Sequence, residues 1–482
     1  MKLTARPWLS AVLLAVLVFL PSSASAGTTP EEIKAFEGYR TLAEKGDPIA
    51  QHNLGYCYFA GLGVAKDFVE AEKWFRKAAD QGDAMAQHNL GVFYRDGVGV
   101  AKNMIEAVKW YRKAADQGFA MAQADLGVYY RDGVGVAKDL VEAAKWFRKA
   151  ADQGYAMAEY NLGDCYANGY GVAKDLVAAV KWYRKAADQG FANAQYNLGV
   201  FYRDGSGVAN DLVEAAKWFR KAANQGDAMA QYNLGYCYFT GIGVAKDMVE
   251  GMKWYRKAAD QGDAMAQYNL GVFYRDGAGV AKDMVEAAKW FRKAADQGLA
   301  NAQSDLGACY SDGSGVTKDL VEAAKWFRKS ADQGYAMAQH NLGYCYFNGL
   351  GVAQDQAEAV KWFRKAADQG YVKAQSDLGA CYFNGSGVAK DFVEGVKWYR
   401  NAADQGYDLA QFDLGLCYRN GEGVAKDEVE AYAYFNLAGI TIEVARKSLA
   451  NLEKGMSPDA RTRGQQRATE LQKEIESKQA GK

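Results

Sequence analysis

Hydrophobic and polar positions along this chain follow a sequence repeat of 36 residues, which is clearest from Phe119 to Gly154. In its first half, apolar or small side chains stand at Ala122, Leu126, Tyr129 and Tyr130, close to the 3.6-residue spacing of one helix face. That spacing predicts one face of an α-helix. A glycine-rich turn follows and separates this helix from a second amphipathic segment, so each repeat is predicted to form a pair of helices.

The second segment begins after Asp139 and runs to about Asp152. Asp139 stands where an N-cap side chain accepts the free backbone N–H groups of a helix start. Trp146 and Phe147 lie in two adjacent apolar rows, which give this helix a broad buried face. Gly154 then ends the helix as the residue after its C-cap.

The repeat occurs eleven times without an insertion, and its terminal glycine returns every 36 residues from Gly82 to Gly406. A fixed period of about 20 to 50 residues is typical of solenoids, in which each unit buries its apolar face against its neighbours. No linker rich in Pro, Ser or charge divides the array. We therefore expect one elongated all-α domain whose contacts are local in sequence.

Charges are balanced within the repeat and over the whole chain. Lys138 with Glu142, and Arg148 with Asp152, lie four residues apart and are expected to pair on an exposed helix surface. The chain has 58 basic and 58 acidic residues, and 56 against 58, a net charge of −2, without the two basic residues of its N-terminal segment. Nucleic-acid binding depends on a basic surplus, so this balance argues against a nucleic-acid partner.

The N-terminal segment has the features of a cleaved secretory signal over residues 1–26. Lys2 and Arg6 precede an apolar run from Trp8 to Leu20, and small residues lead to a predicted cut after Ala26. The run is shorter than the roughly 20 residues of a membrane-spanning helix, so an uncleaved anchor is the weaker alternative. We expect a periplasmic or secreted protein that does not span a membrane after cleavage.

Both ends of the array are predicted to be caps. A capping box starting at Thr29 opens an N-terminal capping helix within residues 27–45, where Phe36, Tyr39 and Leu42 are expected to provide its apolar face. The solenoid then covers 46–441. Residues 442–482 form C-terminal capping helices, of which the last is highly polar and is expected to shield the final apolar face.

The cysteine and histidine positions do not indicate a disulfide, a metal site or a catalytic site. All seven cysteines share one repeat position that is aromatic elsewhere, as at Phe93, which marks a core position. Equivalent sites in packed repeats lie roughly 10 Å apart, too far for a disulfide, so buried thiols are favoured over pairing. His52, His88 and His340 share another position, and no two have the spacing of metal ligands. We expect no metal, no cofactor and no catalytic residues.

The full pattern is A-x-x-x-L-G-x-x-Y, then G-x-G-V-x-x-D, then A-x-x-W-[FY]-x-x-A-A-x-x-G, and it closely resembles the Sel1-like repeat, a relative of the tetratricopeptide repeat. The match runs from Gly46 to about Ala438. The resemblance implies an α-solenoid, a right-handed superhelix of antiparallel helix pairs whose first helices line the concave side. It also implies a protein-binding scaffold or regulator. A cysteine-rich subgroup described as binding or hydrolysing β-lactams has a second cysteine in each repeat, which this chain lacks.

The eleven copies differ mainly at four positions of the first helix, which in the fourth repeat are Met157, Tyr160, Asp164 and Ala167. Their spacing places them on one helix face, here named the first-helix stripe, and the resemblance places that face on the concave side. The candidate partner-binding residues are Tyr160, Tyr196, Tyr232, Tyr268, Arg95, Arg131, Arg203, Arg275, Phe239 and Phe347. The alternative is that the tyrosines only stack on neighbouring helices. A nearby asparagine row, with Asn89 and Asn161 among its members, is expected to bridge groups within the stack rather than hold a peptide.

These observations predict a non-catalytic protein-binding scaffold or regulator of the bacterial cell envelope, which binds protein or peptide ligands along its concave groove. A membrane sensor or an envelope complex is a fitting partner by family analogy. Two alternatives stay open: a secreted host-interaction factor, and a hydrolase of β-lactams or cell-wall peptides.

Overall fold

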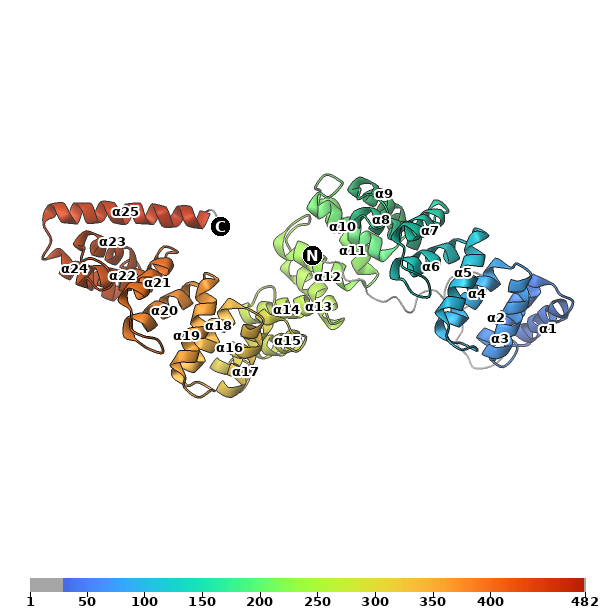
Figure 1. Cartoon of the computed structure of the whole chain (residues 1–482), viewed down its shortest axis with the longest axis horizontal. Helices are drawn as coiled ribbons and strands as arrows, with labels where there is room; N and C mark the ends of the chain where they lie inside the picture. Colours follow the sequence, from blue (N-terminus) through green and yellow to red (C-terminus); the bar gives the residue numbers. More distant parts are fainter. Residues whose placement is uncertain (1–28, 481–482) are drawn as a thin grey trace. The chain divides into compact units, whose positions relative to one another are not determined.

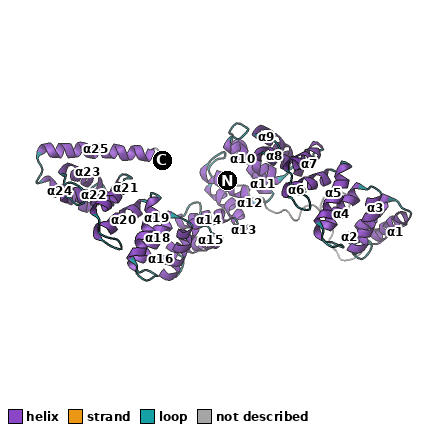
Figure 2. Cartoon of the chain, in the orientation of Figure 1, coloured by secondary structure: helices purple, strands orange, loops and turns teal. Residues whose placement is uncertain are grey.

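The computed structural model describes residues 29–480, and the signal segment predicted at 1–26 lies outside them. All regular structure in the described part is helical, with 25 helices and no strand (Figures 1 and 2). The all-α solenoid predicted from the sequence is therefore confirmed.

Each repeat contributes two helices of about equal length, and consecutive helices pack against each other within each of the two compact units described below. The first helices are α2 (Pro48–Ala60), α4 (Ala84–Asp96), α6 (Ala120–Asp132), α8 (Ala156–Asn168), α10 (Ala192–Asp204), α12 (Ala228–Thr240), α14 (Ala264–Asp276), α16 (Ala300–Asp312), α18 (Ala336–Asn348), α20 (Val372–Asn384) and α22 (Asp408–Asn420). The second helices are α3 (Phe68–Asp80), α5 (Met104–Asp116), α7 (Leu140–Asp152), α9 (Leu176–Asp188), α11 (Leu212–Asn224), α13 (Met248–Asp260), α15 (Met284–Asp296), α17 (Leu320–Asp332), α19 (Gln356–Asp368), α21 (Phe392–Ala403) and α23 (Glu428–Ala438).

The predicted start and stop residues set the helix boundaries. The Asp139 carboxylate accepts from the backbone N–H groups of Val141 and Glu142, both at 3.0 Å, so α7 begins where the sequence indicates. Gly133 ends α6 with φ +73°, a left-handed conformation that favours glycine. Gly135 is required for a different reason, because a Cβ there would lie 2.4 Å from the backbone oxygen of Met104 in the preceding repeat.

The core is a series of similar clusters, each shared by neighbouring helices. In one of them Phe147 and Leu162 are fully buried, and Trp182 of the following helix packs onto them. The predicted core residues Ala122, Leu126 and Tyr129 are buried, while Tyr130 is only partly so. Apart from the C-terminal end, the clusters are built from helices that follow one another in the chain, so the contacts of the repeat array are local in sequence, as expected.

A ladder of glutamine side chains also joins successive repeats. In the third repeat, the Gln123 amide donates to the backbone oxygen of Ala115 at 3.0 Å, and its own oxygen accepts from Gln153 at 2.8 Å. The same pattern recurs in the eighth repeat, where Gln303 donates to the backbone oxygen of Ala295 in the preceding repeat and accepts from Gln333. The ladder therefore satisfies polar groups that packing removes from water.

The helices form two compact units, of which the first ends at Asn210 and the second begins at Asp211. The boundary falls inside the fifth repeat, between α10 and α11. Each unit is a continuous stack of helices. Because packing within the repeat array is local, a solenoid can divide at any repeat without breaking a central core.

Capping helices lie at both ends. Helix α1 (Pro30–Glu44) begins with the predicted capping box at Thr29 and buries Phe36, but Leu42, expected on its apolar face, is half exposed. Helix α24 (Glu443–Glu453) follows the last repeat. Helix α25 (Pro458–Ala480) lies along α23 and covers its apolar face with Leu471 and Ile475 (Figure 1). Among the described helices, none is both long and apolar enough to cross a membrane.

The expected surface ion pairs form differently from the prediction. Glu142 pairs with Lys145, three residues away, at 3.2 Å. The Arg148 guanidinium is half-buried, donates to the Tyr166 hydroxyl of the next repeat, and lies 5.2 Å from the centre of the Trp182 ring. The pairing of Arg148 with Asp152 was wrong because packing between repeats offers the guanidinium a better site than the exposed helix surface.

Candidate functional site

The first-helix stripe consists of positions 2, 5, 9 and 12 of each first helix, counted from its first residue. In α8 these are Met157, Tyr160, Asp164 and Ala167. The structure gives the four positions different environments. Position 5 is half-buried or buried, position 12 packs toward the next repeat, and positions 2 and 9 carry the exposed large apolar side chains of the stripe.

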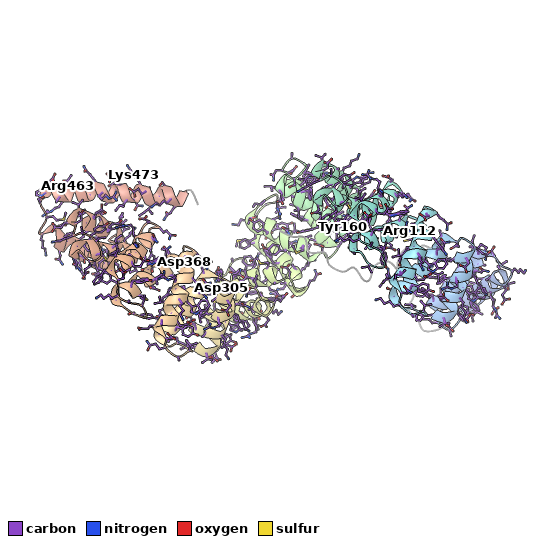
Figure 3. All side chains as sticks on the ribbon, in the orientation of Figure 1. Arg112, Tyr160, Asp305, Asp368, Arg463 and Lys473 are labelled. Atoms are coloured by element: carbon purple, nitrogen blue, oxygen red, sulfur yellow. The ribbon has the colours of Figure 1, made fainter. Side chains whose placement is uncertain are left out.

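The tyrosines at position 5 pack between helices. The Tyr160 ring lies 5.9 Å from that of Tyr183 in the second helix of its own repeat and 5.2 Å from Phe191, which precedes α10. Figure 3 marks the position of Tyr160 in the first unit. Tyr232 packs edge-on against Tyr255. These contacts favour the alternative in which the tyrosines stack on neighbouring helices.

The other two tyrosines of the row have similar surroundings. Tyr268 lies 5.8 Å from Phe291, and burial raises the pKa of its hydroxyl to about 12. Tyr196 is also half-buried. A partner would therefore reach only part of each of these rings.

The arginines at position 12 are held by the aspartate that follows them. Arg131 donates to both carboxylate oxygens of Asp132, at 2.8 and 3.0 Å, and to the Asn161 side-chain oxygen of the next repeat at 3.0 Å. Arg275 repeats this arrangement with Asp276 and with Asp305, 3.3 Å away. Arg95 and Arg203 form the same pair with Asp96 and Asp204.

Phenylalanine at position 12 fills the same space with an aromatic ring. Phe239 stacks on Phe273 of the next repeat, with ring centres 4.3 Å apart. Phe347 lies 6.3 Å from Phe363 of its own repeat and packs against a cluster that includes Leu378 of the next repeat. The arginines and phenylalanines predicted as binding residues thus also close the gap between repeats.

The exposed part of the stripe is formed by positions 2 and 9. Met229 and Met265 at position 2 are 41% exposed, and Tyr236 and Tyr344 at position 9 are 45% and 52% exposed. Positions 2 and 9 are seven residues apart, so both point from the same face of the helix. Sequence reasoning placed these positions in the stripe but favoured the tyrosine row, because a helical pattern does not show which residue the next repeat covers.

Asparagine and histidine side chains are used to join repeats. Nε2 of His88 lies 2.9 Å from the Asp125 carboxylate, and the corresponding distance from His340 to Asp377 is 2.8 Å. Asn89 contacts His52 at 3.0 Å. The bridging role expected of Asn89 and Asn161 is therefore confirmed. Within residues 29–480, no cluster of three or more His, Cys, Asp or Glu residues is arranged to hold a metal ion.

All seven cysteines are buried, as the equivalence with aromatic positions predicts, and none forms a disulfide within the described part of the chain. Burial raises the pKa of Cys57, Cys309 and Cys345 to about 11. It raises the pKa of Cys165, Cys381 and Cys417 to about 12. The thiolate is the reactive form of cysteine, so these protonated thiols are inert core residues.

Comparison with known proteins gives a consistent result. Eleven consecutive segments match the Sel1 repeat: residues 48–83, 84–119, 120–155, 156–191, 192–227, 228–263, 264–299, 300–335, 336–371, 372–407 and 408–439. The crystal structure of c5321, a protective antigen of uropathogenic Escherichia coli strains with an SLR fold, is similar with a TM-score of 0.86 and 38% identity. That similarity covers 93% of this chain and 97% of c5321.

A Sel1 repeat protein from Oxalobacter formigenes is also 38% identical, with a TM-score of 0.50 over 64% of this chain and 89% of that one. No protein with curated annotation matches the chain. Sel1-repeat proteins generally act as protein-interaction scaffolds and are typically non-catalytic. The chain belongs to the Sel1 repeat family.

Proposed function

We propose that the protein is a non-catalytic scaffold or regulator of the bacterial cell envelope, which binds other proteins along the exposed rows of the first-helix stripe. One observation carries this proposal. The residues that differ between otherwise uniform repeats include exposed, large apolar side chains, among them Met229, Tyr236 and Met265. Tyrosine and methionine are enriched at protein interfaces, so this surface has the composition of a binding site.

A second exposed apolar row makes a useful contrast. The second residue of most second helices is valine, and Val213, Val249 and Val285 are 51–57% exposed. These valines are nearly invariant between repeats, and lysine–glutamate pairs such as Lys217 with Glu214 lie beside them. Single apolar residues among charges are ordinary for a protein surface. Because the stripe residues differ from repeat to repeat, a partner can bind them at one defined position along the array. The valine row is nearly the same in every repeat and does not define such a position.

The envelope location rests on the leader predicted at residues 1–26. The absence of catalysis is supported by the protonated cysteines and by the histidines, whose rings join adjacent repeats. Neither group is arranged as a nucleophile with a base. The alternative of a hydrolase acting on β-lactams or cell-wall peptides therefore gains no support from these residues.

The test compares two triple variants in affinity capture from the envelope fraction of the producing cells. Met229→Ser, Tyr236→Ser and Met265→Ser remove exposed apolar groups of the stripe, and Val213→Ser, Val249→Ser and Val285→Ser remove groups of similar exposure from second helices of the same unit. Circular dichroism should show both variants folded. We expect a discrete set of captured proteins that the stripe variant loses and the valine variant retains; equal recovery by both variants would contradict the proposal.

A secreted host-interaction factor is the second candidate. It is favoured by the similarity to c5321, a protective antigen of uropathogenic Escherichia coli strains. Fractionation separates the two candidates. Recovery from the culture supernatant supports the secreted factor, and recovery only after release of the periplasm supports the envelope scaffold.

A further inference from the structure

Position 12 of the first helix, which closes the gap to the next repeat, is small in two repeats, at Ala167 and Ser311. The other nine repeats have phenylalanine or arginine there: Phe59, Arg95, Arg131, Arg203, Phe239, Arg275, Phe347, Phe383 and Arg419. In four of the five repeats with arginine, the following residue is the aspartate that pairs with it. Ser311 is followed by Asp312, so the eighth repeat has kept the aspartate without its arginine.

Arg131 and Arg275 show what this position holds when it is filled. The guanidinium bonds to the next residue's carboxylate and to the side chain at position 6 of the following repeat's first helix. The Arg275 guanidinium also lies 5.9 Å from the centre of the Phe291 ring, which belongs to the second helix of its own repeat. These three partners define an arginine subsite: a carboxylate, a second acceptor and an aromatic ring.

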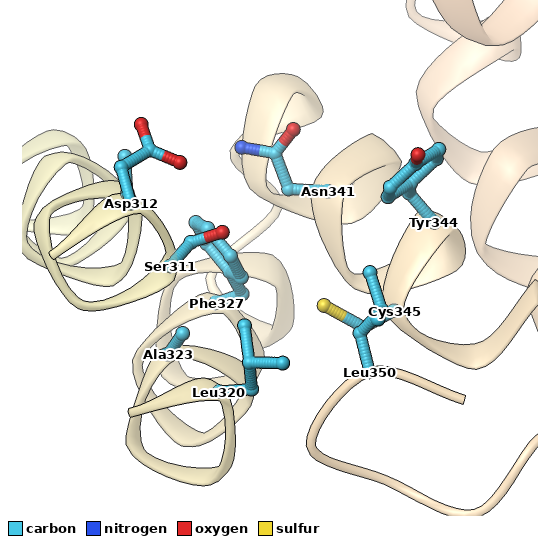
Figure 4. Close-up of a pocket in the computed structure, with 10 residues that line it drawn as sticks. Ser311, Asp312, Leu320, Ala323, Phe327, Asn341, Tyr344, Cys345 and Leu350 are labelled. Atoms are coloured by element: carbon cyan, nitrogen blue, oxygen red, sulfur yellow. The ribbon is translucent and has the colours of Figure 1, made fainter. Parts of the chain in front are cut away.

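The eighth repeat has all three partners around an open pocket. The carboxylate is that of Asp312, which directly follows Ser311 in α16. The second acceptor is Asn341 at position 6 of α18, and the Phe327 ring of α17 lies between these two helices (Figure 4). All of these residues line a cavity of about 220 Å³, and Tyr344, an exposed member of the stripe, lines it as well.

The two acceptors of this pocket are unused. Within residues 29–480, no hydrogen bond or ion pair engages the side chain of Asp312 or of Asn341, whereas Asp132, Asp276 and Asn161 each hold an arginine. The cavity is smaller than the roughly 300–1,000 Å³ of pockets for whole small-molecule ligands. A single side chain fits it better.

We propose that this pocket binds an arginine side chain of a partner polypeptide, whose guanidinium takes the place that Arg131 and Arg275 occupy in their own repeats. Charge complementarity favours a cation, because Asp312 has no counter-ion in the described chain. Geometry favours arginine over lysine, because the planar guanidinium donates in parallel to a carboxylate, has further N–H groups for Asn341 and stacks on an aromatic ring.

The inference rests on the proposed function, since the arginine belongs to a protein bound along the stripe. It names one chemical requirement of that partner, an arginine placed opposite the eighth repeat. The pocket lies on the face from which Tyr344 projects, so a polypeptide following the exposed row would pass its mouth.

The test is a ligand-observed NMR titration of purified protein with Nα-acetyl-arginine-N-methylamide. The citrulline and lysine analogues serve as controls. We expect saturable binding of the arginine probe, and binding at least tenfold weaker for the neutral citrulline analogue of nearly the same shape. Equal binding of all three probes, or no saturable binding of the arginine probe, would overturn the proposal.

Three variants locate the binding. Ser311→Arg fills the pocket with a side chain that four other repeats carry before an aspartate, so we expect a melting temperature no lower than that of the wild type and no probe binding. Asp312→Asn keeps the shape and is expected to weaken binding about tenfold, or about 1.4 kcal/mol. Ala167→Arg is the matched control, because Asn168 follows it instead of aspartate, and it should leave probe binding unchanged. Probe binding that survives Ser311→Arg and Asp312→Asn would refute the site.

The results of these pocket experiments can be distinguished from the result of the test of the proposed function. The probe could bind specifically to the pocket while partner capture is unchanged by the Met229, Tyr236 and Met265 substitutions. That result would support the pocket and refute the stripe. Stripe-dependent capture without probe binding would refute the pocket alone.

Discussion

Replacing Gly127 with alanine should destabilise the protein, although alanine is the better helix former. Gly127 lies inside α6, where it faces the ring of Phe147 in α7. A Cβ at this position would lie 2.6 Å from two ring carbons, where ordinary contacts are 3.4–4 Å. Phe147 is fully buried, so its ring has no free space into which to move.

Two effects of opposite sign determine the magnitude. Alanine gains about 0.8–1.0 kcal/mol over glycine in helix propensity. Forcing an extra methyl into a packed core costs about 1–3 kcal/mol. Because the overlap is close to an ångström against an immobile ring, the upper part of that range applies, and we expect a net loss of about 1–2 kcal/mol.

Gly38 is the matched control, because it lies within α1 and a Cβ there meets no atom within 4 Å. Gly38→Ala should therefore stabilise its helix by about 0.8–1.0 kcal/mol. Unfolding of a solenoid is often not two-state, so the assay is amide hydrogen exchange read by mass spectrometry on peptides from α6 and α7, and from α1. Slower exchange in α6 and α7 of the Gly127→Ala protein would refute the close approach of these helices.

Three further predictions concern the core and its titrating groups. Leu234→Ala empties a fully buried site and should cost about 2–5 kcal/mol, seen as a lower urea midpoint for the second unit. Burial raises the pKa of Asp413 to about 6. The folded protein therefore loses stability as pH rises from the ordinary aspartate pKa near 4 through 6. Asp413→Asn should stabilise the protein by on the order of 1 kcal/mol at pH 7.5 and not at pH 4, as measured by thermal melts. Because the pKa of Cys57 is about 11, its alkylation at pH 8 should be slow in native protein and fast in urea, and equal rates would contradict its burial.

The helices and their boundaries could be predicted because short-range chemistry sets them. Asp139 caps a helix start and Gly133 ends a helix with a left-handed residue in any packing context. Comparison between repeats also predicted buried cysteines, because a position that accepts both Phe93 and Cys57 must be a core position.

Contacts between repeats could not be predicted from spacing along one helix. Tyr160 and Asp164 share a helix face, but only the packed structure shows that Phe191, which directly precedes α10, packs against the Tyr160 ring. Arg148 was assigned to Asp152 for the same reason, while its real partner, Tyr166, belongs to the next repeat.

The Ser311 pocket shows where sequence and structure have to be combined. The sequence alone has a serine where five other repeats have arginine, and that substitution has no evident meaning by itself. It becomes informative once the structure shows that Arg131 bonds to the side chain at position 6 of the next first helix. The equivalent position after Ser311 is Asn341, whose side chain has no such donor in the described chain.

The most direct test of a protein-binding stripe is site-specific photo-crosslinking in the producing cells. A benzoylphenylalanine residue replaces Tyr236 or Tyr344 in the stripe, and Val249 or Val321 of the second helices in separate control strains. We expect discrete crosslinked proteins from both stripe positions and none from the valine positions. Crosslinks only from the valine positions, or from none of the four, would contradict it.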